Sequence, residues 1–238
     1  MTAQQPRLGI LGGMGPQATQ VFYQRILDKT DARRDQEHLP TLIWSDTGMP
    51  DRTQAILSGQ TEPVYQRLLA DARLLEREGC TVLAIPCNTA HYFYDKLEQT
   101  AGVPILNMVE ETVRTAKQRC DKVGILATSG TIETRTYQRQ CEAQGLACEV
   151  PCPADQQKIM DIIYKDIKQG KPADMQAFCE VSDHLRSAGC GRIILGCTEL
   201  SLIKRDEHLD SFYIDSMEVL AKHAILAFGK TPIGFEED

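Results

Sequence analysis

Residues 79–89 read Gly-Cys-Thr-Val-Leu-Ala-Ile-Pro-Cys-Asn-Thr and predict a buried strand that ends at Cys87. The apolar run before Cys87 is typical of a strand that is covered on both faces of a parallel sheet. The polar residues Asn88 and Thr89 then predict the start of a helix. Because ligands of open α/β sheets bind at the carboxyl ends of the strands, this stretch places Cys87 at a candidate site.

A second stretch repeats this pattern 110 residues later. Residues 189–199 read Gly-Cys-Gly-Arg-Ile-Ile-Leu-Gly-Cys-Thr-Glu and align with the first stretch without a gap, so that Cys197 matches Cys87. Residues 8–11 and 123–126 also match, at an offset of 115 residues. Two matches at nearly equal offsets predict two similar lobes rather than one sheet.

Along the chain, apolar strand patterns alternate with helical patterns, which predicts an α/β fold with parallel sheets. We expect one lobe from residues 1–102 completed by 214–238, and a second lobe from 103–213. A pseudo-twofold relation between the lobes would put the active site in the cleft between them. Strands are expected at 7–11, 41–45, up to 87, 122–127, 147–150, up to 196 and 212–214. Residues 103–107 start a new unit, and one helix is expected over 155–169.

The composition is that of an ordinary globular protein, and its 238 residues suffice for two domains of about 100–150 residues. The net charge of −7 argues against binding to nucleic acid or to an anionic membrane surface. The chain has no apolar run of membrane-spanning length and does not begin like a secretory signal, so we expect a cytoplasmic protein. In that compartment its nine cysteines are expected to be reduced.

The glycine-rich segment 12–16 formally fits a dinucleotide-binding fingerprint through Gly13, Gly15 and Ala18. Pro16 stands where the helix should offer N–H groups to a phosphate, and no acidic residue closes the second strand at the expected distance. We therefore favour a tight turn that borders an active site over a nucleotide site.

One interpretation of Cys87 and Cys197 is that both are buried thiols of the hydrophobic core with no chemical function. However, each follows a strand and precedes a helix start, where unpaired N–H groups and the helix dipole favour the thiolate form. The recurrence of both thiols in one repeated unit favours a function for the pair. Cys80 and Cys190 also recur, but at strand starts, and we expect them in the core. His91 follows Cys87 by one helical turn and is interpreted as either a surface residue or an assisting group.

Two thiols on opposite sides of one carbon can exchange its proton, because a thiolate removes it from one face and a thiol supplies it from the other. The product is the mirror image of the substrate. This chemistry requires no metal and no cofactor, and we expect neither. A redox pair would also bring two cysteines together.

Five segments resemble the aspartate racemase branch of the aspartate/glutamate racemase superfamily: residues 11–16, 34–38, 50–53, 86–91 and 196–199. The resemblance implies an isomerase with two Rossmann-like (flavodoxin-like) lobes that works on a small amino acid without pyridoxal phosphate, commonly as a homodimer. Glutamate racemases resemble a pattern with histidine where Glu199 stands here. An isomerase of hydantoin or maleate type and a non-catalytic amino-acid-binding protein remain alternatives.

The same resemblance implies roles for individual residues. Cys87 and Cys197 would be the two proton donors and acceptors. Arg52 would hold the side-chain carboxylate together with Lys168, for which Lys165 is a neighbouring alternative. The remaining residues that the resemblance assigns to substrate binding are Met14, Asn88, Thr89, Ala90, Thr128 and Thr198.

Overall fold

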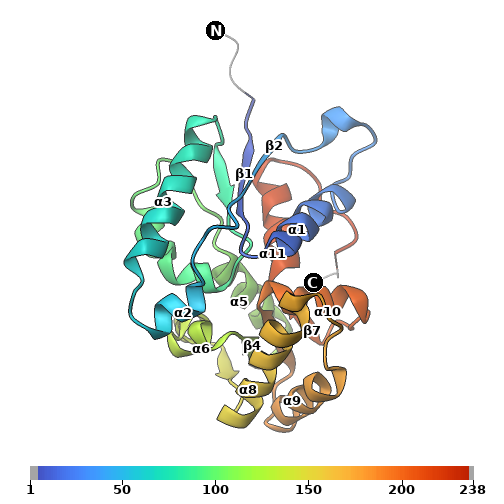
Figure 1. Cartoon of the computed structure of the whole chain (residues 1–238). Coiled ribbons are helices and arrows are strands. Elements are labelled where there is room, and N and C mark those ends of the chain that lie inside the picture. The colour runs from blue at the N-terminus through green and yellow to red at the C-terminus, as the bar shows by residue number, and fades with distance from the viewer. Residues whose placement is uncertain (1–4, 236–238) are drawn as a thin grey trace. The chain divides into compact units, whose positions relative to one another are not determined.

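A computed structural model describes residues 5–235 and is shown in Figure 1. The chain divides into two compact units, which we call unit 1 (residues 1–108 and 220–237) and unit 2 (residues 109–219). Each unit contains one parallel sheet, so the predicted α/β class with two parallel-sheet lobes is confirmed. The domain limits predicted from the sequence, at 102/103 and 213/214, remain a prediction.

The sheet of unit 1 has the strand order β2-β1-β3. Strand β1 (Leu8–Gly12) is central and fully buried, with β2 (Thr41–Ser45) on one side and β3 (Val82–Ala84) on the other. An isolated parallel bridge joins Leu83 to Ile105, beyond β3. The sequence predicted a strand up to Cys87, but β3 ends at Ala84. Pro86 has no N–H to donate to a ladder, which explains the early end.

Helices α1 (Pro16–Asp28) and α3 (Glu62–Arg77) lie on opposite sides of this sheet in Figure 1. Both carry a proline in the first turn, where its missing N–H costs nothing. The five apolar residues of α3 that carry the helical spacing are all buried against the sheet: Val64, Leu68, Leu69, Ala72 and Leu75. The remaining segments are η1 (Asp35–Glu37), α2 (Arg52–Leu57), η2 (Thr89–Phe93), α4 (Tyr94–Glu98) and the part of α11 (Ser216–Ala227) from Leu220 on.

The sheet of unit 2 has the order β5-β4-β6-β7. Strand β4 (Lys122–Ala127) lies between β5 (Ala147–Glu149) and β6 (Arg192–Gly196), and β7 (Tyr213–Asp215) follows at the edge. The first three strands of each unit therefore pair in the same order, with the first strand in the middle. This common order is the structural basis of the sequence repeat.

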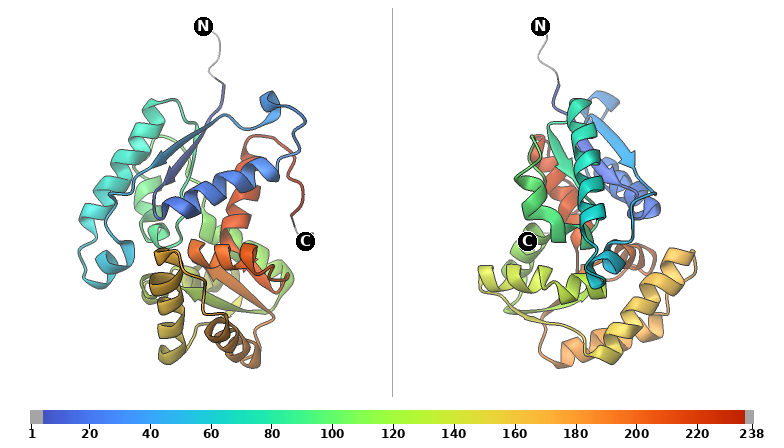
Figure 2. Two further views of the ribbon diagram at one scale, coloured as in Figure 1. Left: turned by 45° about the vertical axis from the view of Figure 1, so that its right-hand side comes forward. Right: turned by 60° about the vertical axis from the view of Figure 1, so that its left-hand side comes forward.

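The helices of unit 2 are α5 (Met108–Arg119, which begins at the last residue of unit 1), α6 (Ser129–Glu133), α7 (Thr136–Gln144), α8 (Pro153–Asp161), α9 (Met175–Ser187) and α10 (Thr198–Asp206). Figure 2 shows α8 and α9 side by side, and Lys158 of α8 pairs with Glu180 of α9 at 3.1 Å. The sequence predicted one helix over 155–169. Instead, α8 passes into a π-helical turn, η3 (Ile162–Asp166), and a 3-10 turn, η4 (Ile167–Gln169).

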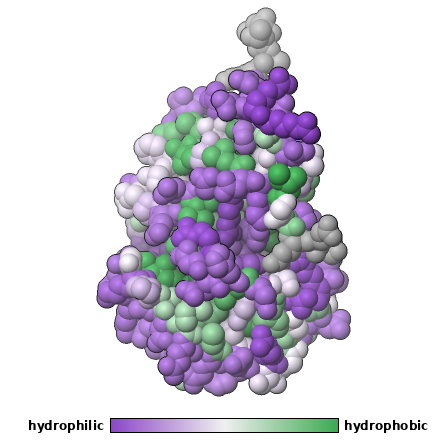
Figure 3. All heavy atoms as spheres, turned by 90° about the vertical axis from the view of Figure 1, so that its right-hand side faces the viewer, coloured by the Kyte–Doolittle hydropathy of each residue, from purple (hydrophilic) through white to green (hydrophobic). Residues whose placement is uncertain are grey.

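Hydrophilic atoms cover most of the face in Figure 3, with apolar groups scattered among them. Among residues 5–235, no helix combines the length and the apolar character that a membrane crossing needs.

Candidate active site

The predicted site residues of unit 1 lie in the loops that follow its three parallel strands. Met14 follows β1, Arg52 begins α2 after β2, and Cys87 follows β3. Parallel strands bring their carboxyl ends to one edge of the sheet, so these loops share that edge. In unit 2, Thr128 follows β4 and Cys197 follows β6, again at carboxyl ends.

The glycine turn after β1 is packed against protein rather than open to a phosphate. A Cβ atom on Gly13, whose φ is +89°, would lie 2.4 Å from the backbone of Asp46. The Thr19 hydroxyl accepts a hydrogen bond from the N–H of Gly13 at 2.9 Å and donates one to the carbonyl of Gly15 at 2.9 Å. The glycines thus allow two loops to approach closely, which agrees with the tight turn that the sequence favoured.

Arg52 is a buried cation at the first position of α2, after the N-cap residue Asp51. Its guanidinium donates to the carbonyl oxygen of Pro50 at 3.0 Å and to that of Met14 at 3.3 Å. The latter bond joins two predicted site residues from different loops. Asp51 fixes the start of the helix by accepting a hydrogen bond from the N–H of Gln54 at 2.7 Å.

Cys87 lies in a short turn in which its N–H donates to the carbonyl of Ile85 at 2.7 Å. Its side chain is 5% exposed, and Asn88, Thr89 and Ala90 are likewise buried. The sequence predicted that a helix starts here, and the segment is the 3-10 turn η2, with Asn88 as its N-cap. The three residues that the family resemblance assigns to substrate binding therefore adjoin the thiol in one compact turn.

His91 is buried, and its hydrogen bonds define its tautomer. The N–H of Met108 donates to Nε2 at 3.1 Å, so Nε2 carries no proton, and Nδ1 donates to the carbonyl of Cys87 at 2.9 Å. Burial lowers the pKa of His91 below its usual value, which keeps the ring neutral. A surface position is thus excluded, and the ring braces the Cys87 turn from inside.

Cys197 is the N-cap residue of α10 and is 5% exposed. Its Sγ donates to Oε2 of Glu199 at 2.9 Å. Burial, followed by the negative charge of Glu199, raises the pKa of Cys197 well above its usual value, although Lys168 opposes the shift. The expectation that the helix start favours a thiolate is wrong for this residue, because burial and a carboxylate at the second helical position outweigh the helix dipole.

The two candidate lysines have different surroundings. Lys168, in η4, pairs with Oε1 of Glu199 at 2.7 Å, and 25% of its side chain is exposed. Lys165, in η3, pairs with Asp161 at 2.8 Å, and 67% of its side chain is exposed. Lys168 is therefore the lysine that lies beside the Cys197 turn.

The two predicted threonines of unit 2 are buried at helix starts. Thr128 is the N-cap of α6, and its hydroxyl accepts a hydrogen bond from the N–H of Thr131 at 3.4 Å. Thr198 opens α10, and its hydroxyl lies 3.3 Å from Oε2 of Glu199. Thr128 has a capping role that accounts for its presence, whereas Thr198 belongs to the cluster around Glu199.

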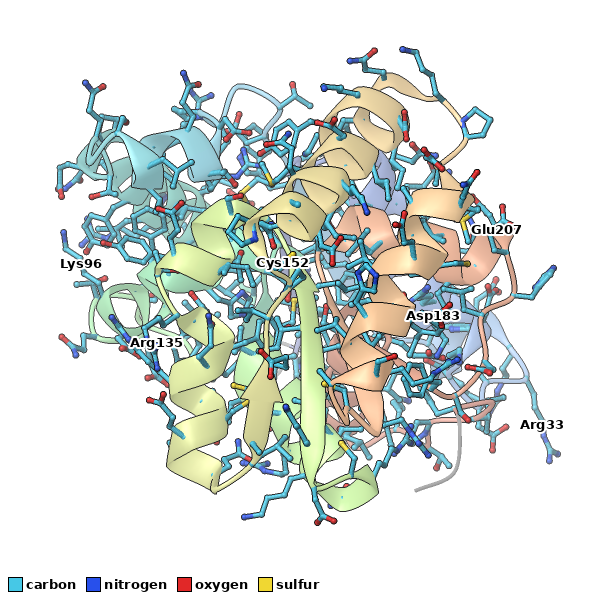
Figure 4. The ribbon with its side chains drawn as sticks, turned by 90° about the horizontal axis from the view of Figure 1, so that it is seen from below. Arg33, Lys96, Arg135, Cys152, Asp183 and Glu207 are labelled. Atoms are coloured by element: carbon cyan, nitrogen blue, oxygen red, sulfur yellow. The ribbon has the colours of Figure 1, made fainter. Side chains whose placement is uncertain are left out.

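The other repeated cysteines are core residues, as expected. Cys80 and Cys190 are buried, and burial raises the pKa of both thiols. By contrast, Cys152, labelled in Figure 4 at the start of α8, is exposed. In the part of the chain that the structure describes, no group of three or more His, Cys, Asp or Glu side chains has the arrangement of a metal site.

Comparison with known proteins decides the family. The profile of the Asp/Glu/hydantoin racemases matches residues 11–224, which include both cysteine turns. The chain belongs to the Asp/Glu/hydantoin racemase family. Membership in this family supports an isomerase of the racemase type, and it confirms the resemblance that the sequence motifs indicated.

Individual members of the racemase family cover nearly the whole chain. The broad specificity amino-acid racemase RacX of Bacillus subtilis (strain 168) is 29% identical over 233 residues, or 93% of this chain and 97% of that protein. The aspartate racemase of Picrophilus torridus has a TM-score of 0.80 at 27% identity and covers 95% of this chain and 96% of its own. A glutamate racemase from Francisella tularensis subsp. tularensis SCHU S4, in complex with D-glutamate, has a TM-score of 0.71 at 16% identity, with coverages of 94% and 81%. That last likeness concerns the fold alone.

Sequence reasoning did not find the contacts of Glu199 with Cys197 and Lys168. The sequence used Glu199 only to distinguish two branches of the family. The signal that was available is its place two residues after Cys197 at a helix start, where a side chain can bend back toward the N-cap residue. Its contact with Lys168, which lies 31 residues earlier, could not be predicted from spacing.

Proposed function

We propose that the protein racemises an amino acid, with aspartate as the preferred substrate, by proton exchange at Cα between Cys87 and Cys197. The observation that carries the proposal is the repeat itself. Each unit presents a buried cysteine after the third strand of the same β2-β1-β3 order, which in unit 2 is β5-β4-β6. A racemase needs equivalent groups for the two faces of one carbon, and a duplicated unit supplies them.

The proposed reaction balances as a proton exchange. The thiolate of one cysteine forms an S–H bond with the proton of Cα, whose electron pair remains on the substrate as a carbanion. The thiol of the other cysteine gives its proton to the opposite face and becomes a thiolate. N–H donors of the Cys87 turn, around Asn88 and Thr89, would stabilise the negative charge that develops on the substrate carboxylate.

Two cations support a dicarboxylic substrate. Arg52 presents a planar guanidinium that suits a bidentate carboxylate, and Lys168 adds a point charge beside the Cys197 turn. The aspartate racemase of Picrophilus torridus, at 27% identity over 95% of this chain, supports aspartate. The broad specificity racemase RacX supports a wider range of side chains, and racemisation of other amino acids is the second candidate. We further propose a homodimer, which sedimentation of the purified protein tests, and a location in the cytoplasm, which fractionation of cells tests.

The experiment incubates the purified protein with L-aspartate in D2O without pyridoxal phosphate. Chiral chromatography should detect D-aspartate, and mass spectrometry should find deuterium at Cα. The Cys87→Ser variant should lose racemisation by more than about 1,000-fold, because serine is a far weaker acid than a thiol. Cys152→Ser is the matched control, since this exposed cysteine should be dispensable. Normal racemisation by Cys87→Ser would overturn the mechanism, whereas activity on other amino acids alone would overturn the aspartate assignment.

A further inference from the structure

Glu199 joins three predicted site residues of unit 2. Its Oε2 accepts a hydrogen bond from the Cys197 thiol at 2.9 Å and one from the Thr198 hydroxyl at 3.3 Å. Its Oε1 pairs with Nζ of Lys168 at 2.7 Å. The carboxyl group is buried, with 5% of the residue exposed, so both of its oxygens are engaged inside the protein.

We infer that Glu199 is a positioning residue that holds Cys197 as a thiol and accepts the thiol proton when Cys197 becomes the base. The inference rests on the proposed function, because it assigns a role within that proton exchange. The family match does not assign this residue a role.

The direction of the hydrogen bond supports this role. The salt bridge with the Lys168 ammonium favours the ionised form of Glu199, and a carboxylate can only accept hydrogen bonds. Cys197 must then supply the proton of the bond between them, and it can do so only as a thiol. Glu199 also faces the reacting sulfur from the first turn of the same helix, α10, so the contact does not depend on a flexible loop.

Charge balance supports the second part of the inference. A neutral Cys197 thiol, a Glu199 carboxylate and a Lys168 ammonium have a net charge of zero. Loss of the thiol proton to water would leave this group with one negative charge, which is costly because Cys197 and Glu199 are both buried. Transfer of the same proton to Glu199 creates the thiolate while the net charge stays zero. The carboxylate is therefore the acceptor that avoids the largest desolvation cost.

The proton sequence needs no reactant other than water, with which protons are exchanged at its end. In the direction that uses Cys197 as the base, its S–H bond breaks and a Glu199 O–H bond forms. The Cys197 thiolate then removes the Cα proton, and the Cys87 thiol donates its proton to the opposite face. Glu199 afterwards releases its proton to water while the Cys87 thiolate regains one, which restores the starting state.

The test measures the ionisation of Cys197 directly and does not depend on activity. Thiolate absorbance near 240 nm is titrated as the difference between the protein and its Cys197→Ser variant, in the native and in the Glu199→Gln background. Glu199→Gln keeps the size of the side chain but removes the negative charge and leaves Lys168 in place. The midpoint of Cys197 should therefore fall, with a rise of about tenfold or more in the thiolate fraction at a fixed pH below it.

Glu207→Gln is the matched control, because Glu207 follows the same helix but is exposed, and Figure 4 labels it at the outer edge of unit 2. In Glu207→Gln, the titration midpoint of the Cys197 thiol should equal that in the native protein. An unchanged Cys197 midpoint in folded Glu199→Gln overturns the inference. If Glu199→Gln does not fold, Glu199→Asp is used in its place. Its shorter side chain should weaken the contact with Sγ of Cys197 and shift the Cys197 midpoint. An unchanged midpoint in Glu199→Asp also overturns the inference.

Activity then separates this inference from the proposed function. If the Cys197 midpoint falls in Glu199→Gln but the native protein racemises no amino acid, the proposed function is overturned. The same result still supports a role of Glu199 in keeping Cys197 protonated. Where the native protein racemises aspartate, Glu199→Gln should lose about 100-fold in kcat, with KM changed less than about threefold. A large rise in KM with an unchanged kcat would instead give Glu199 a role in substrate binding through Lys168, and would overturn the proton role.

Discussion

The Nδ1 atom of His91 lies 2.9 Å from the backbone carbonyl oxygen of Cys87, while its Nε2 accepts a hydrogen bond from the N–H of Met108 at 3.1 Å. The ring therefore connects the Cys87 turn to the residue at which α5 begins. Both bonds need a neutral ring with its proton on Nδ1. His91 thus holds the Cys87 turn in place through these two hydrogen bonds.

Replacement of His91 should reduce stability. His91→Phe fills the space but removes the hydrogen bonds that the ring makes with the carbonyl of Cys87 and with the N–H of Met108, and removal of a buried hydrogen-bond partner costs about 1–3 kcal/mol. We expect the free energy of unfolding to fall by about 2–4 kcal/mol, measured by urea denaturation. Tyr92→Phe, at the exposed neighbouring position, is the matched control and should change it by less than about 0.5 kcal/mol.

The same ring predicts a pH dependence. Burial lowers the pKa of His91 in the folded state, whereas in the unfolded chain it returns to about 6.5. The unfolded chain thus binds the extra proton, so this contribution is complete above about pH 6.5 and is lost as the pH falls below it. Between pH 7 and pH 5 the native protein should lose more stability than His91→Phe. Equal losses in both proteins would contradict a buried neutral ring.

A second buried group in unit 1 should titrate near pH 6. Burial raises the pKa of Asp71 to about 6, with a further contribution from the charge of Asp46, although the hydrogen bond from the Trp44 indole opposes the shift. Trp44 Nε1 donates to Asp71 at 2.9 Å, and it belongs to the only tryptophan of the chain. Tryptophan fluorescence should therefore report the ionisation of Asp71 with a midpoint near pH 6.

The variant Asp71→Asn should remove this transition and increase stability above pH 6. The folded-state pKa lies above the unfolded value, so the proton favours folding at low pH, and this contribution is lost as the pH rises through about 6. The amide oxygen can still accept the hydrogen bond from Trp44, and the amide NH2 group can donate to Asp46 at any pH. We expect a gain of about 1 kcal/mol at pH 8 and none at pH 4. Asp183→Asn, at an exposed position that Figure 4 labels, should leave the fluorescence transition intact.

The choice between Lys168 and Lys165 shows where sequence reasoning reached its limit. Both lie in a segment that the sequence predicted as one helix over 155–169, in which regular spacing would fix the face of each residue. A π-helical turn at Ile162–Asp166 and a 3-10 turn at Ile167–Gln169 change that phase, so periodicity could not decide which lysine faces Glu199. Only the tertiary contact decides it.

Other parts of the fold and site were predictable because their signals are local or repeated. The two units follow from two matched segments at nearly equal offsets, and the cysteine positions follow from apolar runs that end at polar residues. The Cys87 turn was less predictable, because Pro86 ends β3 early and a 3-10 turn replaces the expected helix. The raised pKa of Cys197 depends on burial and on a carboxylate folded back over the thiol, and neither can be derived from the general rule for helix starts.

The two lysines provide a direct comparison of function. Lys168→Met should raise KM for aspartate by about 10-fold or more, because it removes a cation that the substrate side chain would meet and deprives Glu199 of its ion pair. Lys165→Met, on an exposed ion pair with Asp161, should change KM less than about twofold. Steady-state kinetics gives KM for aspartate in both variants. A large rise in KM for Lys165→Met and a small one for Lys168→Met would assign the substrate contact to Lys165.

At Arg52, the effect of the positive charge can be measured separately from that of the planar guanidinium. Arg52→Lys keeps a positive charge in the same loop, but a lysine cannot reproduce a planar fork that reaches the carbonyls of Pro50 and Met14 together. If Arg52 binds the side-chain carboxylate of the substrate, kcat/KM for aspartate should fall by about 10- to 100-fold, while kcat/KM for alanine, which has no side-chain carboxylate, should change less than about threefold. A parallel loss with both substrates would mean that Arg52 supports the Met14 and α2 loops rather than the substrate, because damage to the loops affects every amino acid alike. An accompanying thermal unfolding measurement checks this second outcome, since loss of loop support should also lower the melting temperature.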